Sequence, residues 1–159
     1  MDEDDYVDGA DSGFLMREPS QEKPTIPHTK GLYVGAPACF ALEIACQQLH
    51  RAYDHPEYHM GIYLVGSALE RPDWRDIDVR MILQDEYFEQ LFPYAAMSQG
   101  SWEFDPRWMI LTVAISDWLR KQTGLPIDFQ FQPMTHANER HKKRRNALGL
   151  IFAKDTSNG

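Results

Sequence analysis

The sequence predicts a mixed α/β (α+β) domain built of layers. Apolar residues recur at helical spacing in two long segments, residues 36–55 and 105–124. Three shorter segments, 60–66, 76–84 and 125–133, are rich in strand-forming apolar residues. Because helices and strands alternate along the chain, we expect a layered structure with helices packed on a sheet.

Composition limits the class of protein. The 159 residues are 43% hydrophobic and carry a net charge of −8, which disfavours non-specific binding of nucleic acid by the chain as a whole. No apolar run approaches the roughly 18 residues of a membrane span, and the acidic N-terminus does not resemble a signal peptide. Cys39 and Cys46 lie about 10 Å apart if they share a helix, too far for a disulfide. We therefore predict a soluble cytoplasmic protein with no membrane partner.

Charge is unevenly distributed along the chain. Residues 1–30 are acidic and then rich in Pro, Ser and Lys, so we predict a disordered tail before a single domain over residues 31–159. A basic run lies in a predicted last helix, residues 135–152, and consists of Arg140, Lys142, Lys143, Arg144 and Arg145. A solvated helix face is the first interpretation of this run. The alternatives are contacts with RNA, with a triphosphate or with the acidic N-terminus.

The first predicted helix, residues 36–55, begins with a proline in its first turn. Phe40, Ile44 and Leu49, together with neighbouring alanines, form an apolar stripe near the 3.6-residue period. We expect this stripe to face the core, and the proline at position 56 to end the helix.

The second long helix has recognisable ends. Asp105 precedes a proline and is predicted to cap the helix, while Gly124 is predicted to stop it. Trp108 and Trp118 are expected in the core rather than in a base-stacking surface. A short helix is predicted within residues 85–97.

The predicted strands differ in their patterns. Residues 60–66 are continuously apolar, so we expect a strand buried on both faces, with Tyr63 in the core. In the second strand Asp76 and Asp78 alternate with apolar residues and share one face. Asp128 repeats this alternation in the third strand.

The spacing of these aspartates favours a metal site. Asp76 and Asp78 place two carboxylates roughly 6.6 Å apart at Cα on one face. Their mutual repulsion is relieved by a divalent cation, and Mg²⁺ (or Mn²⁺) prefers one or two carboxylates together with phosphate oxygens and water. If the third strand lies beside the second, Asp128 joins them. Three carboxylates can hold two ions about 3.5–4 Å apart for displacement at phosphorus.

Gly66 and Ser67 follow the first strand and suggest an anion site. A strand that turns into a helix presents backbone N–H groups to an anion. Glycine allows a phosphate to approach the backbone closely, and a serine hydroxyl can donate to it.

The ordered set of these motifs resembles a known family. The stretch "YLVGSALERPDWRDIDV" has glycine-serine, eight residues and D-x-D, and "IDF" follows later. This pattern, over residues 61–131, is similar to the nucleotidyltransferase superfamily that includes DNA polymerase β, in particular its minimal members. The resemblance implies a nucleotidyltransferase fold, in which a small mixed sheet is flanked by helices.

The resemblance also implies roles for individual residues. Gly66 and Ser67 would hold the triphosphate, and Asp76 and Asp78 would bind both Mg²⁺ ions. Asp128 would bind the catalytic ion and help to deprotonate the attacking hydroxyl. The implied reaction moves a nucleoside monophosphate from an NTP, such as ATP, to a hydroxyl and releases pyrophosphate. The acceptor would be a partner protein, an RNA end or a small cationic molecule.

The turn after Ser67 departs from the family pattern. Many minimal members carry a basic, glycine-containing turn there, whereas residues 68–74 of this chain read "ALERPDW". Arg71 or Arg75 would then contact the phosphates instead.

Other interpretations stay open at this point. Taken separately, the D-x-D pair fits a solvated strand entrance, and glycine-serine fits an ordinary turn. A catalytically inactive interaction or regulatory protein on the same fold is the main alternative. A glycosyltransferase that uses D-x-D is a third hypothesis, but it leaves the glycine-serine element unexplained.

Overall fold

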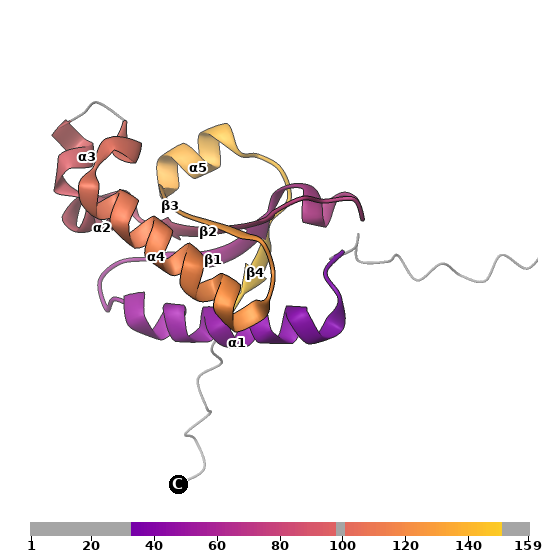
Figure 1. The fold of residues 1–159 in the computed structure, drawn as a ribbon. Helices are drawn as coiled ribbons and strands as arrows, with labels where there is room; N and C mark the ends of the chain where they lie inside the picture. Colours follow the sequence, from indigo (N-terminus) through magenta and orange to yellow (C-terminus); the bar gives the residue numbers. More distant parts are fainter. Residues whose placement is uncertain (1–32, 98–100, 151–159) are drawn as a thin grey trace, which may run out of the picture.

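The computed structural model describes residues 33–97 and 101–150 (Figure 1), so the predicted tail over residues 1–30 lies outside the described part. The elements, in chain order, are α1 (Ala36–Tyr53), β1 (Met60–Val65), the 3₁₀ turn η1 (Gly66–Leu69), β2 (Ile77–Leu83), α2 (Asp85–Leu91), α3 (Pro93–Met97), the 3₁₀ turn η2 (Trp102–Phe104), α4 (Pro106–Thr123), β3 (Ile127–Pro133), α5 (Met134–Arg140) and β4 (Asn146–Leu148). Mixed helices and strands confirm the predicted class.

The strands form one mixed sheet in the order β3-β2-β1-β4. β1 pairs antiparallel with both β2 and β4, whereas β2 and β3 run parallel. Parallel neighbours need a crossover, and the helical segment from α2 to α4 supplies it. The second and third strands are therefore neighbours, which is the condition that the joining of Asp128 with the second strand required.

The two faces of the sheet have different surroundings. Alternate residues of the strands point toward α1 and α4 and form the core; they are Ile62, Leu64, Ile77, Val79, Met81, Ile127, Phe129 and Phe131. Figure 1 shows α1 on one side of the sheet and α5 on the other. We call the face on the α5 side the open face; its residues include Asp78, Arg80, Asp128 and Gln130.

The buried side of α1 matches the predicted stripe in part. Leu49 and Ala45 are buried as predicted, but Phe40 and Ile44 are 68% and 61% exposed, and the neighbouring Leu42 and Cys46 contact the core instead. Both stripes satisfy the 3.6-residue period, so periodicity alone could not choose between them. Cys39 and Cys46 are both free, as predicted.

The prediction that the first strand is buried on both faces was wrong. Ile62 and Leu64 are buried, but Tyr63 and Val65 on the open face are only partly covered. Residues 60–66 are apolar throughout because the open face of β1 is also partly covered. On this face the Arg145 guanidinium lies 5.9 Å from the centre of the Tyr63 ring. Trp108 is buried as predicted, whereas Trp118 is half-buried.

The predicted last helix over residues 135–152 was also too long. α5 ends at Arg140, and residues 146–148 form β4 instead. β4 covers the edge of β1 that would otherwise expose unpaired backbone groups, and Leu148 is fully buried there. Tertiary pairing thus overrides the local helical preference.

No helix in the described ranges has the combination of length and apolarity needed to cross a lipid bilayer.

Asp105 caps α4 as predicted and does more than cap it. Its Oδ1 accepts hydrogen bonds from the backbone N–H groups of Arg107 and Trp108, at 2.8 and 3.1 Å. Its Oδ2 accepts from the Tyr94 N–H at 3.0 Å, which ties α3 to the start of α4. The carboxylate is only 2% exposed.

Replacing Asp105 with Ala should lower the free energy of unfolding by about 1–2 kcal/mol, because the start of α4 loses its acceptor. The matched control is Asp117→Ala, on the exposed side of the same helix, where an ion pair with Arg120 is solvated. It should cost less than about 0.5 kcal/mol. Urea unfolding of both variants checks this, and equal losses would contradict it.

Candidate functional site

Two aspartates meet at the centre of the open face. Asp78 on β2 and Asp128 on β3 are direct partners in the parallel register. Their neighbours in sequence, Ile77, Val79, Ile127 and Phe129, are all fully buried on the core side. Because side chains alternate along a strand, this burial directs both carboxylates to the open face. Their side chains are 26% and 42% exposed.

Arg80 lies between these carboxylates. Its Nη2 donates to Asp78 Oδ1 at 3.1 Å and to Asp128 Oδ2 at 2.9 Å. Its Nη1 donates to two backbone carbonyls, those of Asp128 at 2.7 Å and Val79 at 3.1 Å. With 12% of its side chain exposed, Arg80 is the most covered member of the trio. The sequence motifs gave Arg80 no role; the available signal was a cation two residues after Asp78, which the alternation of a strand places on the same face.

The protonation of Asp78 reflects this setting. Burial raises the pKa of its carboxyl above the ordinary value, and the nearby negative charge of Asp128 raises it further. The Arg80 guanidinium acts in the opposite direction and lowers the Asp78 pKa. A second cation at this position would favour the charged carboxylate in the same way.

Gly66 lies directly against Asp78. It follows Val65, the register partner of Asp78 on β1, and opens η1 with a φ of +78°. A Cβ atom at Gly66 would collide with Asp78 Oδ2, so only glycine fits this position without displacing the carboxylate. Ser67 is half-buried in the same turn, and its carbonyl accepts the N–H groups of Glu70 and Arg71.

Three other predicted site residues lie further out. Asp76 is exposed and precedes β2, which begins at Ile77. Arg71 and Arg75 are also exposed, and Arg71 pairs with Asp73 at 3.4 Å. Within residues 33–97 and 101–150 no group of three or more His, Cys, Asp or Glu side chains is arranged to hold a metal ion. The structure thus joins Gly66, Asp78 and Asp128 and leaves Asp76 apart from them.

The basic run is solvent-exposed as first interpreted, except for the half-buried Arg145, but beyond Arg140 it is not helical. Residues 140–145, which we call the basic segment, leave the end of α5 and cross toward β4. All of them except Lys142 line a cavity of about 480 Å³ whose wall also includes Gly66, Asp78 and Arg80. Four cationic side chains of the segment contribute to this wall, namely those of Arg140, Lys143, Arg144 and Arg145.

Specific contacts hold the basic segment in place. Arg145 donates to the carbonyls of Ala137 at 2.5 Å and His141 at 3.2 Å, and to Asn138 Oδ1 at 3.1 Å. Lys143 forms an ion pair with Glu70 at 3.3 Å. The Lys143–Glu70 ion pair joins the basic segment to the turn that follows Ser67.

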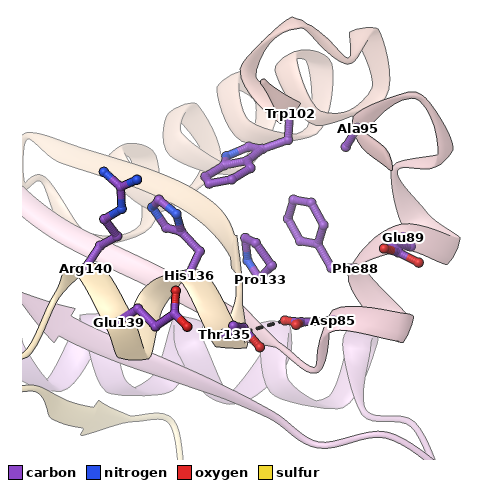
Figure 2. A pocket seen from close by; sticks show the side chains of 10 residues that line it. All are labelled: Asp85, Phe88, Glu89, Ala95, Trp102, Pro133, Thr135, His136, Glu139 and Arg140. Atoms are coloured by element: carbon purple, nitrogen blue, oxygen red, sulfur yellow. Dashed lines mark hydrogen bonds between the residues drawn. The ribbon is translucent and has the colours of Figure 1, made fainter. Parts of the chain in front are cut away.

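A second cavity of about 380 Å³ adjoins the first and shares Trp102, His136 and Arg140 with it (Figure 2). The Trp102 and His136 rings meet edge-on, with 4.5 Å between their centres. Phe88 and three carboxylate-bearing residues, Asp85, Glu89 and Glu139, complete much of the wall. Burial lowers the pKa of His136, and the neighbouring His141 and Arg140 lower it further, while Glu139 and Glu103 act in the opposite direction.

Comparisons with protein-family models, with curated proteins and with solved structures give no match to this chain. The case for its function therefore depends on the geometry of the open face.

Gly66→Ala should destabilise the protein more than Gly124→Ala. Both glycines have φ near +70°, so alanine costs about 1 kcal/mol at either position. Nothing lies within 4 Å of a Cβ at Gly124, whereas at Gly66 the Asp78 carboxylate must move. We expect at least about 1 kcal/mol of additional loss for Gly66→Ala in urea unfolding. Equal losses would show that the contact with Asp78 can relax without cost.

Proposed function

We propose that this protein is a Mg²⁺-dependent nucleotidyltransferase with the nucleotidyltransferase fold, acting in the cytoplasm. One observation supports this most strongly: Asp78 and Asp128 face each other on adjacent parallel strands, and Asp78 lies on the wall of a cationic cavity. Gly66, the residue that the sequence motif assigns to the triphosphate, touches Asp78 at the same place. Carboxylates, a glycine turn and basic side chains therefore converge, as the reaction requires.

The residues on the open face fit a divalent cation. The Arg80 guanidinium shows that positive charge is accommodated between Asp78 and Asp128, within hydrogen-bonding distance of both carboxylates. Two oxygen ligands from protein carboxylates, completed by phosphate oxygens and water, match the preference of Mg²⁺. When bound, Mg²⁺ would neutralise charge on the phosphates. Asp78 and Asp128 would hold it, and Asp76 could approach only by moving from its exposed position.

The protein's own residues would position the triphosphate. Arg140, Lys143 and Arg144 line the cavity where the triphosphate would bind, and their charge opposes its own. Gly66 leaves room for the phosphate chain beside the Asp78 carboxylate. Catalysis in this class is mostly orientation and charge stabilisation, both of which a fixed sheet edge and a basic segment can provide.

The reaction transfers the nucleoside monophosphate in one displacement. The acceptor hydroxyl oxygen forms a bond to the α-phosphorus, and the bond from this phosphorus to the bridging oxygen of pyrophosphate breaks. Asp128, the more exposed of the two carboxylates, accepts the hydroxyl proton. The acceptor is a hydroxyl of a protein, an RNA end or a small molecule, and the second cavity adjoins the place where it would enter.

A second candidate function is nucleotide binding without transfer, in a regulatory or interaction protein. The observation that favours it is the set of four hydrogen bonds that Arg80 makes, two to the carboxylates and two to backbone carbonyls. If Arg80 excludes every divalent cation, the cavity still binds a nucleotide through the basic segment. The two candidates differ in whether metal is bound and pyrophosphate released.

We expect labelled ATP, CTP, GTP or UTP with Mg²⁺ to yield a labelled acceptor and pyrophosphate. Asp78→Asn and Asp128→Asn should each reduce the rate on the order of 100-fold, because the cation loses a charged ligand. Asp73→Asn, at an exposed position in the turn, is the matched control and should retain wild-type activity. Labelled product that is equal in wild type and both site variants would contradict transfer. Nucleotide binding without product would favour the second candidate.

Lys143→Ala should weaken NTP binding about tenfold, because a charge-assisted contact to the triphosphate is lost. Lys121→Ala removes one positive charge as well, but Lys121 lies on the last turn of α4, outside the cavity. This variant should therefore bind NTP normally. Calorimetry at several salt concentrations measures both variants. Equal weakening in the two variants would mean that only net charge matters, and not the position of the basic segment.

A further inference from the structure

The way in which Arg80 contacts the carboxylates leads to an inference about metal number that rests on the proposed function. Arg80 uses one oxygen of each carboxylate, Oδ1 of Asp78 and Oδ2 of Asp128. The Gln130 side chain also donates to Asp128 Oδ2, at 3.4 Å. The second oxygens of the two carboxylates, Asp78 Oδ2 and Asp128 Oδ1, lie outside the Arg80 contacts, and Asp78 Oδ2 is the atom that faces Gly66.

Arg80 is anchored by the backbone as well as by the two carboxylates. Its Nη1 donates to the carbonyl oxygens of Val79 and Asp128, which belong to the paired strands and cannot rotate away. The carboxylate contacts therefore account for only half of the four hydrogen bonds of its two Nη atoms. A cation that competes for the carboxylates leaves this backbone anchor intact, so the guanidinium stays near the site.

The charges then allow one divalent cation more readily than two. Asp78 and Asp128 contribute two negative charges, and the fixed guanidinium already offsets one of them. A single Mg²⁺ adds two positive charges, which the phosphates of a nucleotide can balance. A second Mg²⁺ would lie beside a permanent cation, and like charges at short range in a partly buried site repel strongly. It would also need further oxygen ligands, and Asp76 is exposed and apart from the pair.

We propose that Arg80 takes the place of one of the two divalent cations, so that the site binds a single Mg²⁺ per nucleotide complex. Asp78 and Asp128 would hold this ion, while the guanidinium supplies the second positive charge from a fixed position. Arg80 is therefore a positioning residue that acts through the two carboxylates. The resemblance to two-metal enzymes holds for Asp78 and Asp128 but not for the number of ions.

The test counts Mn²⁺ ions by electron paramagnetic resonance, with protein in excess over α,β-methylene ATP. Wild type should bind one Mn²⁺ per nucleotide complex. Arg80→Met removes the guanidinium but keeps an unbranched side chain, and it should bind two, with the line broadening of neighbouring ions. Arg80→Lys keeps the positive charge and should remain at one. Arg107→Met, on an exposed position of α4, is the control for loss of an arginine elsewhere.

The outcomes separate this inference from the proposed function. Two Mn²⁺ ions in wild type, or one in folded Arg80→Met, overturns the role of Arg80 while transfer activity can still be observed. If wild type forms no Mn²⁺–nucleotide complex at all, the proposed function fails and the inference fails with it. Circular dichroism in the presence of Mn²⁺ verifies folding. If Arg80→Met does not fold, the wild-type count still decides the number of ions.

Discussion

The contact of Arg80 with Asp78 and Asp128 is the interaction on which the open face depends. Parallel pairing of β2 and β3 places two carboxylates directly opposite each other, where their charges repel unless a cation lies between them. Arg80 provides that cation from the same strand as Asp78 and adds bonds to the backbone of both strands. The sheet can thus carry two facing acids in the folded protein before any ligand binds.

The apolar face of the sheet is the reason that this arrangement is fixed. Sliding a strand by one residue would move every core side chain to the open face and every site residue into the core. The fully buried Val79 and Phe129, which neighbour the two acids in sequence, exclude such a shift. Core packing by α1 and α4 therefore determines the direction of the carboxylates, although neither helix contributes a residue to the wall of the cationic cavity.

The positive charge that lines the cavity is opposite in sign to the net charge of the chain. The protein has a net charge of −8, but the basic segment concentrates positive charge over the open face. Such a local field attracts polyanions, while the overall negative charge discourages indiscriminate binding to nucleic acid. This contrast supports a small phosphate-bearing ligand, such as a nucleotide, for the first cavity. The neighbouring cavity, with its rings and carboxylates, has a chemically different surface, and under the proposed function it would contact the group that receives the nucleotide.

The sequence by itself determined the mixed fold class, the cap of α4 and the turning of Asp78 and of Asp128 away from the apolar side of its own strand, because these follow from local periodicity and capping chemistry. Only the parallel pairing of β2 with β3 placed the two aspartates side by side on one face. The sequence could not determine the buried stripe of α1 or the path of the basic segment, since local patterns allowed two answers in each case. The pairing of β4 with β1 decided the path of the basic segment, and it brought the basic side chains into the cavity that Asp78 also lines. The role of Arg80 also appeared only in three dimensions, because half of its hydrogen bonds reach a residue 48 positions away.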